Sequence, residues 1–481
     1  MADSIAQLEP TALWERFHSL TQVPRPSKRE EKVRAWARAW AAEHDYEILS
    51  DAIGNIVVRV PASPGREAAP TVVLQSHLDM VCEKNRGVEH DFDEEPIRTE
   101  IRDGWVGAIG TTLGADNGIG VAASMAAATS PDCTHGPLEL LFTTDEETGL
   151  TGAAQLDASI VQGRLLLNLD TEEDNVICIG CAGGADTILE LPLQRGDGTS
   201  NTALELRGLR GGHSGMNIHE NRGNAIQLLA RILRRAQREG LIDRVAAIDG
   251  GDKSNAIPRE ARALFHRAGN DAGWNAFLAK ARSTLATELA GIEEGVTLEV
   301  VDAEATTLLD DASSDRLLSL LVALPHGVLG MSQTLEDLVE TSSNLAAVHC
   351  SSGSARIVTS SRSSLAPALE GVCATIRAAA ELAGASWSES DAYPGWQPNP
   401  DSTLTATLKE VFETLWNVPP KVEAVHAGLE CGLLGERIDG LDMVSFGPTI
   451  TGAHSPDEQV HIEAVAKFWK TLTAALDRLS R

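Results

Sequence analysis

The chain has 481 residues, and its 69 aspartate and glutamate residues outnumber 40 lysine and arginine residues, which gives a formal net charge of −29. A chain of this length exceeds the size at which one hydrophobic core keeps growing, so we expect two domains. Because binding to nucleic acid or to an anionic membrane is driven by Lys and Arg, the charge argues against both as partners. A bound metal cation, or a small substrate with a positive group, suits this charge better.

The N-terminal sequence MADSIAQLEPTALWERF contains no basic segment followed by an apolar core. No window approaches the roughly 18 uncharged apolar residues of a membrane span. We therefore expect neither a signal peptide nor a membrane anchor, and a cytoplasmic protein. The 7 cysteines are scattered along the chain, which is not typical of a disulfide framework.

The first third of the chain alternates helical and strand patterns. Residues 28–44 have apolar side chains at helical spacing, and residues 47–60 indicate two strands separated by a Gly-Asn turn. Short apolar runs then occur at 71–75, 138–144 and 164–169, and an alanine-rich segment, 121–130, is a candidate crossover helix. Continuous apolar runs are typical of strands covered on both faces, so this region predicts a layered α/β architecture.

The pattern changes near residue 187. Strand-like alternation, an amphipathic helix over 221–240 and a helix, strand and helix within 313–385 follow. A weak likeness between 253–265 and 341–360 hints at two similar halves. After a proline- and glycine-rich stretch near residue 396, the layered pattern returns. The expected division is therefore a first domain formed by residues 1–186 and 398–481, and a second domain, residues 187–397, inserted into it.

Acidic and imidazole side chains follow each of the three apolar runs. In open α/β sheets, ligands bind beyond the carboxyl ends of the strands, so these side chains point to one place. With two further candidates, the set comprises His77, Asp79, Asp116, Glu146, Glu147, Asp170 and His454. A His77–Asp79 pair alone is also typical of a buried histidine bonded to an aspartate, and it is the other strand ends that favour a ligand site.

These side chains suit two divalent metal ions, which prefer oxygen and imidazole ligands. Two ions that share one carboxylate, and that each bind one more carboxylate and one histidine, need three carboxylates and two histidines. The sequence supplies this set and two further acids. Asp79 shares a strand face with His77 and can accept the proton of its second ring nitrogen. Glu146 and Glu147 are adjacent, so one can bind metal while the other acts as a general base.

Several short motifs occur in an order that resembles one known family. They are HLD at 77–79, GADNG at 114–118, DEETG at 145–149, NLD at 168–170, GGHSG at 211–215, KSNAIP at 253–258, HAGLECG at 426–432 and GAH at 452–454. This order is similar to that of the dinuclear-zinc peptidases, which include carnosinases, tripeptidase and carboxypeptidase G, and most of all to that of the bacterial aminoacyl-histidine dipeptidases. The resemblance implies a zinc-peptidase-like, three-layer α/β catalytic domain with an inserted α+β lid domain.

The resemblance also implies two bound divalent metal ions, namely zinc, with manganese or cobalt as alternatives. Carried over by position, the implied ligands are His77 and Asp170 on one ion, Glu147 and His454 on the other, and Asp116 between them. The family tends to have a cis peptide bond after the bridging aspartate, which here joins Asp116 to Asn117.

Catalytic roles are implied in the same way. Glu146 would be the general base and acid that activates a water held between the ions. Asp79 would orient a metal ligand, and His213 in the lid would stabilise the oxyanion.

Other lid motifs imply substrate contacts. Asn255 and Arg362 match positions that hold the substrate's C-terminal carboxylate in relatives, although Arg362 lies in SSRSS and not in the family's common DxR form. Glu430 is either the partner of a free substrate amine or a solvated charge or helix cap.

We therefore expect a hydrolase that cleaves dipeptides with a free amino terminus, Xaa-His dipeptides among them. The alternatives are an amidohydrolase of the same family that acts on N-acyl amino acids, and a nonhydrolytic metal-dependent binding protein. The expected partner is a small peptide substrate. The sequence leaves open whether the chain is a monomer or a homodimer, and so whether His213 serves its own active site or a partner's.

Overall fold

The computed structural model describes residues 4–268, 270–303, 305–333, 335, 337–390, 392–399 and 401–481. The chain divides into two compact units. Unit 1 comprises Met1–Gly180, Trp396–Ala424 and Leu429–Arg481, and unit 2 comprises Cys181–Gly395 and Val425–Gly428. The expected division differs from these units in three segments, 181–186, 396–397 and Val425–Gly428. The last of these belongs to unit 2, in which the backbone N–H of Ala182 donates to the carbonyls of Val425 and Ala427. No helix in the described part of the chain is long and apolar enough to cross a membrane.

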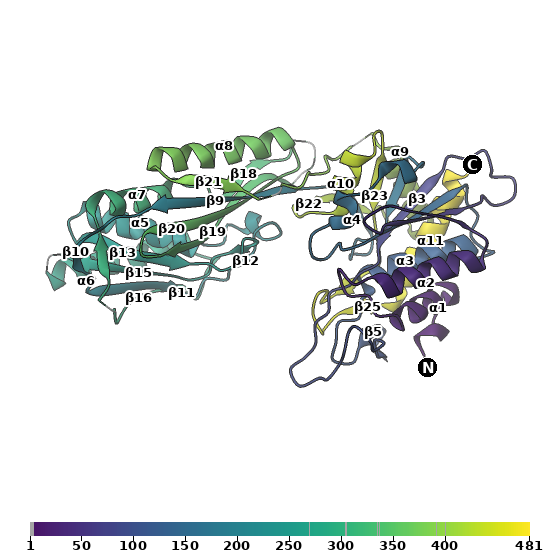
Figure 1. The fold of residues 1–481 in the computed structure, drawn as a ribbon, viewed down its shortest axis with the longest axis horizontal. Helices are drawn as coiled ribbons and strands as arrows, with labels where there is room; N and C mark the ends of the chain where they lie inside the picture. Colours follow the sequence, from purple (N-terminus) through teal and green to yellow (C-terminus); the bar gives the residue numbers. More distant parts are fainter. Residues whose placement is uncertain are drawn as a thin grey trace. The chain divides into compact units, whose positions relative to one another are not determined.

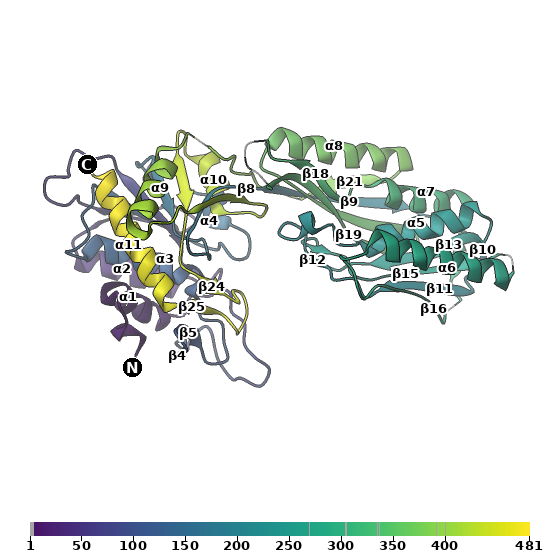
Figure 2. The same cartoon turned by 180° about the vertical axis from the view of Figure 1, so that it is seen from behind.

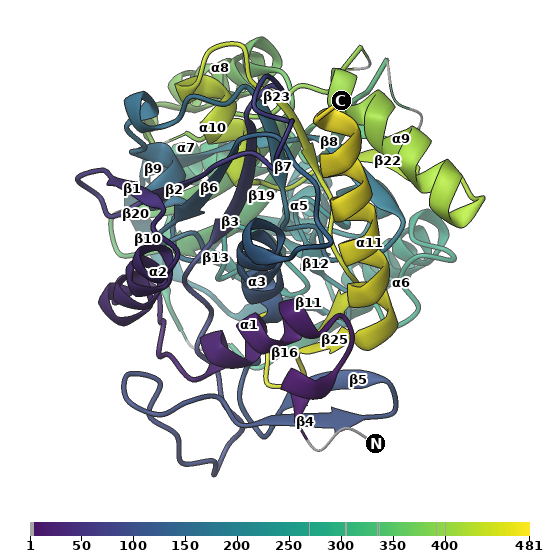
Figure 3. The ribbon, with the colours of Figure 1, turned by 90° about the vertical axis from the view of Figure 1, so that its right-hand side faces the viewer.

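The centre of unit 1 is an eight-stranded sheet (Figure 3). In spatial order its strands are β1 (Glu47–Ser50), β2 (Ile56–Val60), β6 (Leu138–Thr143), β3 (Val72–His77), β7 (Leu165–Asn168), β23 (Asp442–Ser445), β8 (Val176–Cys181) and β22 (Lys421–Val425). The strands β6, β3, β7 and β23 run parallel to their neighbours within this group. The predicted strands in the three apolar runs are confirmed as β3, β6 and β7, and every residue of β3 and β6 is buried.

Helices cover this sheet and complete the predicted α/β architecture. They are α1 (Thr11–Thr21), α2 (Glu31–Glu43), α3 (Ala115–Thr129), α4 (Thr151–Ala154), α9 (Thr403–Trp416), α10 (Glu430–Arg437) and α11 (Ile462–Leu479). The alanine-rich α3 packs against β3 and α1, and α9 packs against β23 and α11. A small sheet beside them contains β24 (Ile450–Thr451), β25 (Gln459–His461), β5 (Trp105–Ala108) and β4 (Thr99–Arg102).

Unit 2 contains an antiparallel nine-stranded sheet (Figure 1). Its order is β16 (Thr297–Val301), β11 (Thr202–Arg207), β15 (Ala261–Arg267), β13 (Ile242–Gly250), β19 (Val339–Cys350), β20 (Ser354–Ser363), β9 (Gly183–Pro192) and β21 (Ser386–Glu389), with β18 (Gly327–Met331) paired to β19. Two short pairs accompany it, β10 (Arg195–Thr199) with β17 (Thr307–Leu309) and β12 (Gly212–His213) with β14 (Ala256–Ile257).

Four helices share one hydrophobic core with this sheet (Figure 2). They are α5 (Ala225–Arg238), α6 (Asp271–Glu288), α7 (Asp311–Ala323) and α8 (Ala366–Ala383). The amphipathic helix predicted over 221–240 is α5, which begins where the side chain of Asn224 accepts a hydrogen bond from the N–H of Gln227. Its apolar face, with Leu229 and Leu233, is fully buried in this core.

Apart from β18, the large sheet of unit 2 consists of two four-stranded parts that meet at β13 and β19. In chain order one part is β11, α5, β13, β15, α6 and β16, and the other is β9, α7, β19, β20, α8 and β21. The two parts have the same spatial strand order, read outward from the β13–β19 pairing. The two Ser-Asn pairs that drew attention in the sequence do not occupy equivalent places, since Asn255 precedes β14 and Asn344 lies within β19.

Candidate metal centre

The polar side chains at the ends of parallel strands meet at one edge of the unit 1 sheet. His77 is the last residue of β3 and pairs in register with Thr143, the last residue of β6. Gln75 of β3 pairs with Asn168, the last residue of β7, two residues before Asp170. Because parallel strands end at the same edge, the loops after β3, β6 and β7 present their side chains together.

Four groups of possible metal ligands occur among the described residues. One is His77, Glu146 and Glu147, another is Glu30, Asp79 and Asp145, and the remaining two share Asp116 at this edge of the sheet. The first of the two that share Asp116 is His77, Asp116 and Asp170, and the second is Asp116, Glu147 and His454, with ligand atoms within 4.8 Å of one another in each group. These are the five residues that the sequence singled out as metal ligands.

Asp116 lies between the two histidines. Its Oδ1 atom is 3.1 Å from Nε2 of His77, and its Oδ2 atom is 3.3 Å from Nε2 of His454. Each oxygen of the shared carboxylate therefore faces a different group. The peptide bond between Asp116 and Asn117 is cis, as the resemblance implies.

Each group contains one further carboxylate. Oδ1 of Asp170 is 3.5 Å from Nε2 of His77, and Oε2 of Glu147 is 2.9 Å from Nε2 of His454. Each group thus offers one imidazole, one carboxylate of its own and one oxygen of Asp116. Imidazole and carboxylate ligands in this ratio fit divalent transition metals such as zinc.

The electrostatics of the cluster favour bound cations. Burial raises the pKa of Asp170 to about 7, and the nearby charge of Asp116 contributes to this. The carboxylates of Asp116 and Glu147 in turn raise the pKa of His454 to about 11. So many carboxylates gathered in a buried place need positive charge nearby, which divalent ions supply.

Asp79 lies behind His77 and is fully buried. Its Oδ1 atom is 3.4 Å from Nδ1 of His77 and accepts the N–H of Glu146 at 3.1 Å. Its Oδ2 atom accepts the hydroxyl of Ser27 at 2.7 Å and the N–H of Glu147 at 3.2 Å. Burial acts to raise the pKa of Asp79, but the contact with His77 and these hydrogen bonds outweigh it and lower the pKa to about 2. Asp79 thus stays ionised and contacts the ring nitrogen of His77 that faces away from Asp116.

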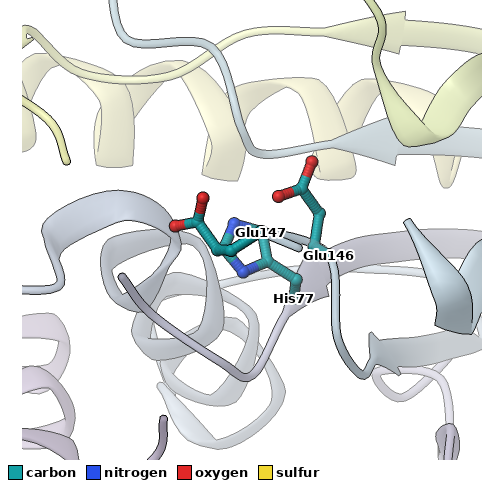
Figure 4. Close-up of side chains that lie close together, drawn as sticks. All are labelled: His77, Glu146 and Glu147. Atoms are coloured by element: carbon teal, nitrogen blue, oxygen red, sulfur yellow. The ribbon is translucent and has the colours of Figure 1, made fainter. Parts of the chain in front are cut away.

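Glu146 and Glu147 extend from adjacent backbone positions, and their carboxyl groups point in different directions near His77 (Figure 4). Glu147 faces His454, whereas Glu146 makes no contact with that histidine among the ion pairs of the described residues. Burial raises the pKa of Glu146 well above its ordinary value. A carboxyl group in such an environment holds a proton more readily than an exposed one, which suits proton transfer.

Glu430 lies deeper than the sequence suggests. It is the first residue of α10, it is 1% exposed, and its Oε2 atom accepts hydrogen bonds from Nε2 of Gln75 at 2.6 Å and Oγ1 of Thr143 at 2.8 Å. Its Oε1 atom is buried and has no hydrogen-bond partner among the described residues. Burial raises the pKa of Glu430 to about 7. Glu430 is therefore not a solvated surface charge.

The remaining candidates lie in unit 2. Nδ1 of His213, in β12, accepts the N–H groups of Gly215 and Met216 at 3.2 and 3.0 Å. Burial and the charge of Arg362 lower the pKa of His213, so its ring is neutral. A neutral ring that accepts at Nδ1 carries its hydrogen on Nε2 and can donate there. Asn255 is exposed in the segment before β14.

Arg362 lies in β20, is 8% exposed and donates from Nη1 to the hydroxyl of Tyr393 at 2.8 Å. Opposite it in the sheet, Ser342 contacts Nε2 of His426 at 2.7 Å.

Sequence reasoning did not select Tyr393 or Ser342, and no motif marks them. It also missed Glu172, whose pKa is raised to about 8 by burial and by the charges of Asp116 and Asp170. Its position two residues after Asp170 was the available signal.

The fold and this site define a class of protein. The chain belongs to peptidase family M20/M25/M40, whose model matches residues 73–478.

Particular relatives agree over the whole chain. The cytosol non-specific dipeptidase of Escherichia coli is 41% identical over 481 residues, covering 99% of each protein. The crystal structure of aminoacylhistidine dipeptidase from Vibrio alginolyticus has 39% identity and a TM-score of 0.92, over 99% of this chain and 98% of that one. The aminopeptidase PepT of Bacillus cereus, at 16% identity and a TM-score of 0.58 over 98% and 100% of the two chains, shares the fold.

Proposed function

We propose that this protein is a metal-dependent dipeptidase that hydrolyses dipeptides with a free amino terminus, Xaa-His dipeptides among them. The observation that carries the proposal is the pair of ligand groups that share Asp116, with Glu146 beside them. The names of the E. coli and V. alginolyticus relatives support the substrate class, and the former supports a cytoplasmic location.

The first ion would be held by His77 and Asp170, the second by Glu147 and His454, and Asp116 would contact both. Zinc suits this set, with manganese or cobalt as alternatives. When bound, two such ions polarise the scissile carbonyl and lower the pKa of a water. Asp79, whose Oδ1 atom is 3.4 Å from Nδ1 of His77, would orient the ring and leave Nε2 to hold an ion.

Glu146 moves the proton in the reaction. Its carboxylate takes a proton from the attacking water as the oxygen bonds to the peptide carbonyl carbon, and it then gives that proton to the nitrogen of the leaving amine. The position of Glu146 supports this role, because its carboxyl oxygen lies within 4.8 Å of ligand atoms of His77 and Glu147.

Three residues of unit 2, His213, Asn255 and Arg362, and Glu430 of unit 1 would contact the substrate, as the family resemblance implies. Nε2–H of His213 is available to donate to the oxyanion, because Nδ1 is already occupied as an acceptor. Asn255 and Arg362 would bind the C-terminal carboxylate, for which a planar guanidinium is well shaped. Glu430 would pair with the free amine through Oε1, the buried oxygen that lacks a partner among the described residues.

The test compares Glu146→Gln with the wild type and with Glu31→Gln, an exposed acid on α2. The first variant should retain two metal ions per chain, while kcat on a simple dipeptide falls at least ~10²- to 10⁴-fold, the usual worth of a general base. Glu31→Gln should behave as wild type. Near-normal turnover by Glu146→Gln would exclude the assignment, and wild-type protein that binds metal without hydrolysing any dipeptide would favour a binding protein.

A further inference from the structure

Glu458 binds an unusual number of backbone groups for a single carboxylate. Its Oε2 atom accepts the N–H groups of Leu113 and Gly114 at 2.7 and 2.9 Å. Its Oε1 atom accepts those of Ala115 and Asp116 at 2.7 and 3.2 Å. Glu458 is 3% exposed, so these bonds are shielded from water.

These four N–H groups belong to the segment that carries Asp116 into α3. Asp116 and Asn117 have non-helical backbone angles, so these N–H groups lie in the irregular start of α3 and need acceptors from outside it, which the buried carboxylate of Glu458 supplies. Glu458 comes from a distant part of the chain, four residues after His454 in the same loop. It therefore ties the segment of one candidate ligand to the segment of another.

Arg25 holds the same segment from its other side. It is 2% exposed, and Nη1 donates to the carbonyls of Leu78 and Asp79 at 3.0 and 2.7 Å, while Nη2 donates to the carbonyl of Gly114. Arg25 thus connects the loop after β3, which follows His77, to the loop before Asp116.

Gly114 shows how closely Arg25 and Glu458 enclose this segment. Its N–H bonds Glu458 and its carbonyl bonds Arg25. Its φ of +70° is one that other residues rarely adopt, and a Cβ atom there would collide with Nη2 of Arg25. The segment before Asp116 is consequently fixed by two buried, oppositely charged side chains.

We propose that Arg25 and Glu458 are positioning residues of the metal centre, which set the distance between His77, Asp116 and His454 so that Asp116 can face both ions. This inference rests on the proposed function. Neither side chain belongs to a candidate ligand group among the described residues, so both act through the backbone of the ligand loops. The competing explanation is that Glu458 only caps α3 and Arg25 only fills the core.

Glu458→Gln separates the two explanations. The amide nitrogen would have to face two N–H donors where an oxygen now accepts both, so the segment before Asp116 would shift. Supporting groups around metal ligands typically contribute ~10- to 100-fold to metal affinity. A cap without a positioning role would lower stability and leave metal affinity unchanged.

A matched control exists in unit 1. Glu139 is 2% exposed, accepts the N–H groups of Gln162 and Gly163 at 2.8 and 2.9 Å, and pairs with Arg59 at 3.1 Å. It lies near the start of β6, whereas the metal centre lies beyond the end of that strand. Glu139→Gln therefore removes a similarly bonded buried carboxylate away from the site.

The experiment titrates Co²⁺ into the full-length protein after metal removal by a chelator, and follows both the calorimetric affinity and the visible absorption of the bound ion. Thermal unfolding of the metal-free proteins is recorded alongside. We expect wild type and Glu139→Gln to bind two ions alike, and Glu458→Gln to bind at least one of them ~10- to 100-fold more weakly, with an altered cobalt spectrum. Arg25→Lys, which keeps the charge but loses the fork of donors, should show the same direction of change.

The inference would be overturned if Glu458→Gln bound cobalt with an affinity within about threefold of wild type and with an unchanged spectrum. It would also be overturned if Glu139→Gln lost as much cobalt affinity as Glu458→Gln. If Glu458→Gln does not fold, Arg25→Lys decides by the same criteria. A wild-type protein that binds no cobalt or zinc would contradict the proposed function itself, and is thus distinguishable from a failure confined to the variants.

Discussion

Replacing Asp79 with asparagine removes a charge and one acceptor from behind the metal centre. Four groups surround the carboxylate: Nδ1 of His77 and the N–H of Glu146 at Oδ1, and the hydroxyl of Ser27 and the N–H of Glu147 at Oδ2. Asparagine has only one oxygen. If that oxygen remains toward His77, the new NH₂ group faces Ser27 and Glu147.

The two neighbours respond differently to this change. The hydroxyl of Ser27 can turn and accept from the NH₂ group, whereas the N–H of Glu147 can only donate and is left without an acceptor. A buried donor without a partner costs ~1–3 kcal/mol, so the free energy of unfolding should fall by about that amount. Loss of the charge that supports His77 should weaken metal binding ~10- to 100-fold, about 1.4–2.7 kcal/mol.

Metal affinity is measured by competition with a chromophoric chelator, and stability by urea unfolding of the metal-free protein. Ser27→Ala is the control, because it removes one donor and leaves the charge of Asp79, so its metal affinity should stay within about threefold of wild type. If Asp79→Asn binds metal as tightly as wild type does, the charge of Asp79 does not support His77 and the reasoning is wrong.

Three further predictions concern His77, Glu430 and His426. His77→Ala should lower the metal content below two ions per chain and abolish dipeptide hydrolysis, because His77 is the only imidazole in its ligand group; two ions measured by elemental analysis would contradict this. Glu430→Gln should reduce kcat/KM on a dipeptide by ~30-fold or more, which is the usual cost of unpairing a buried charge, and should leave kcat/KM on an N-acetylated analogue unchanged. Equal effects on both substrates would rule out a contact between Glu430 and the substrate amine and would favour an N-acyl amidohydrolase. Burial, with the charge of Arg362, lowers the pKa of His426 to about 4, whereas an unfolded histidine titrates near 6.5. Below pH ~6.5 the unfolded chain therefore binds a proton that the folded chain does not, and up to about 3 kcal/mol of stability is lost as the pH falls through 4. His426→Gln should reduce this loss in the free energy of unfolding between pH 7.5 and pH 4.5, as measured by urea unfolding. An unchanged loss would show that another group is responsible.

The sequence was sufficient for the layered architecture and for the polar side chains at the strand ends. Continuous apolar runs identify buried strands because the pattern is local, and the polar residues that end β3, β6 and β7 are visible without any knowledge of pairing. The weak internal likeness pointed to two similar halves in unit 2, although its Ser-Asn pairs do not align the two halves that the sheet contains.

Only the tertiary structure decided how these residues meet. That each oxygen of Asp116 faces a different histidine depends on strand register and on the loop that holds His454, which local patterns do not encode. Glu458 looks like an ordinary surface acid in the sequence, and its four backbone bonds reach residues more than 340 positions earlier. Glu430 likewise accepts hydrogen bonds from Gln75 of β3 and Thr143 of β6, which lie far from it in the sequence. Sequence patterns determine what each segment can form, because they depend on neighbouring residues. The chemistry of the site depends on contacts between distant segments, which only folding brings together.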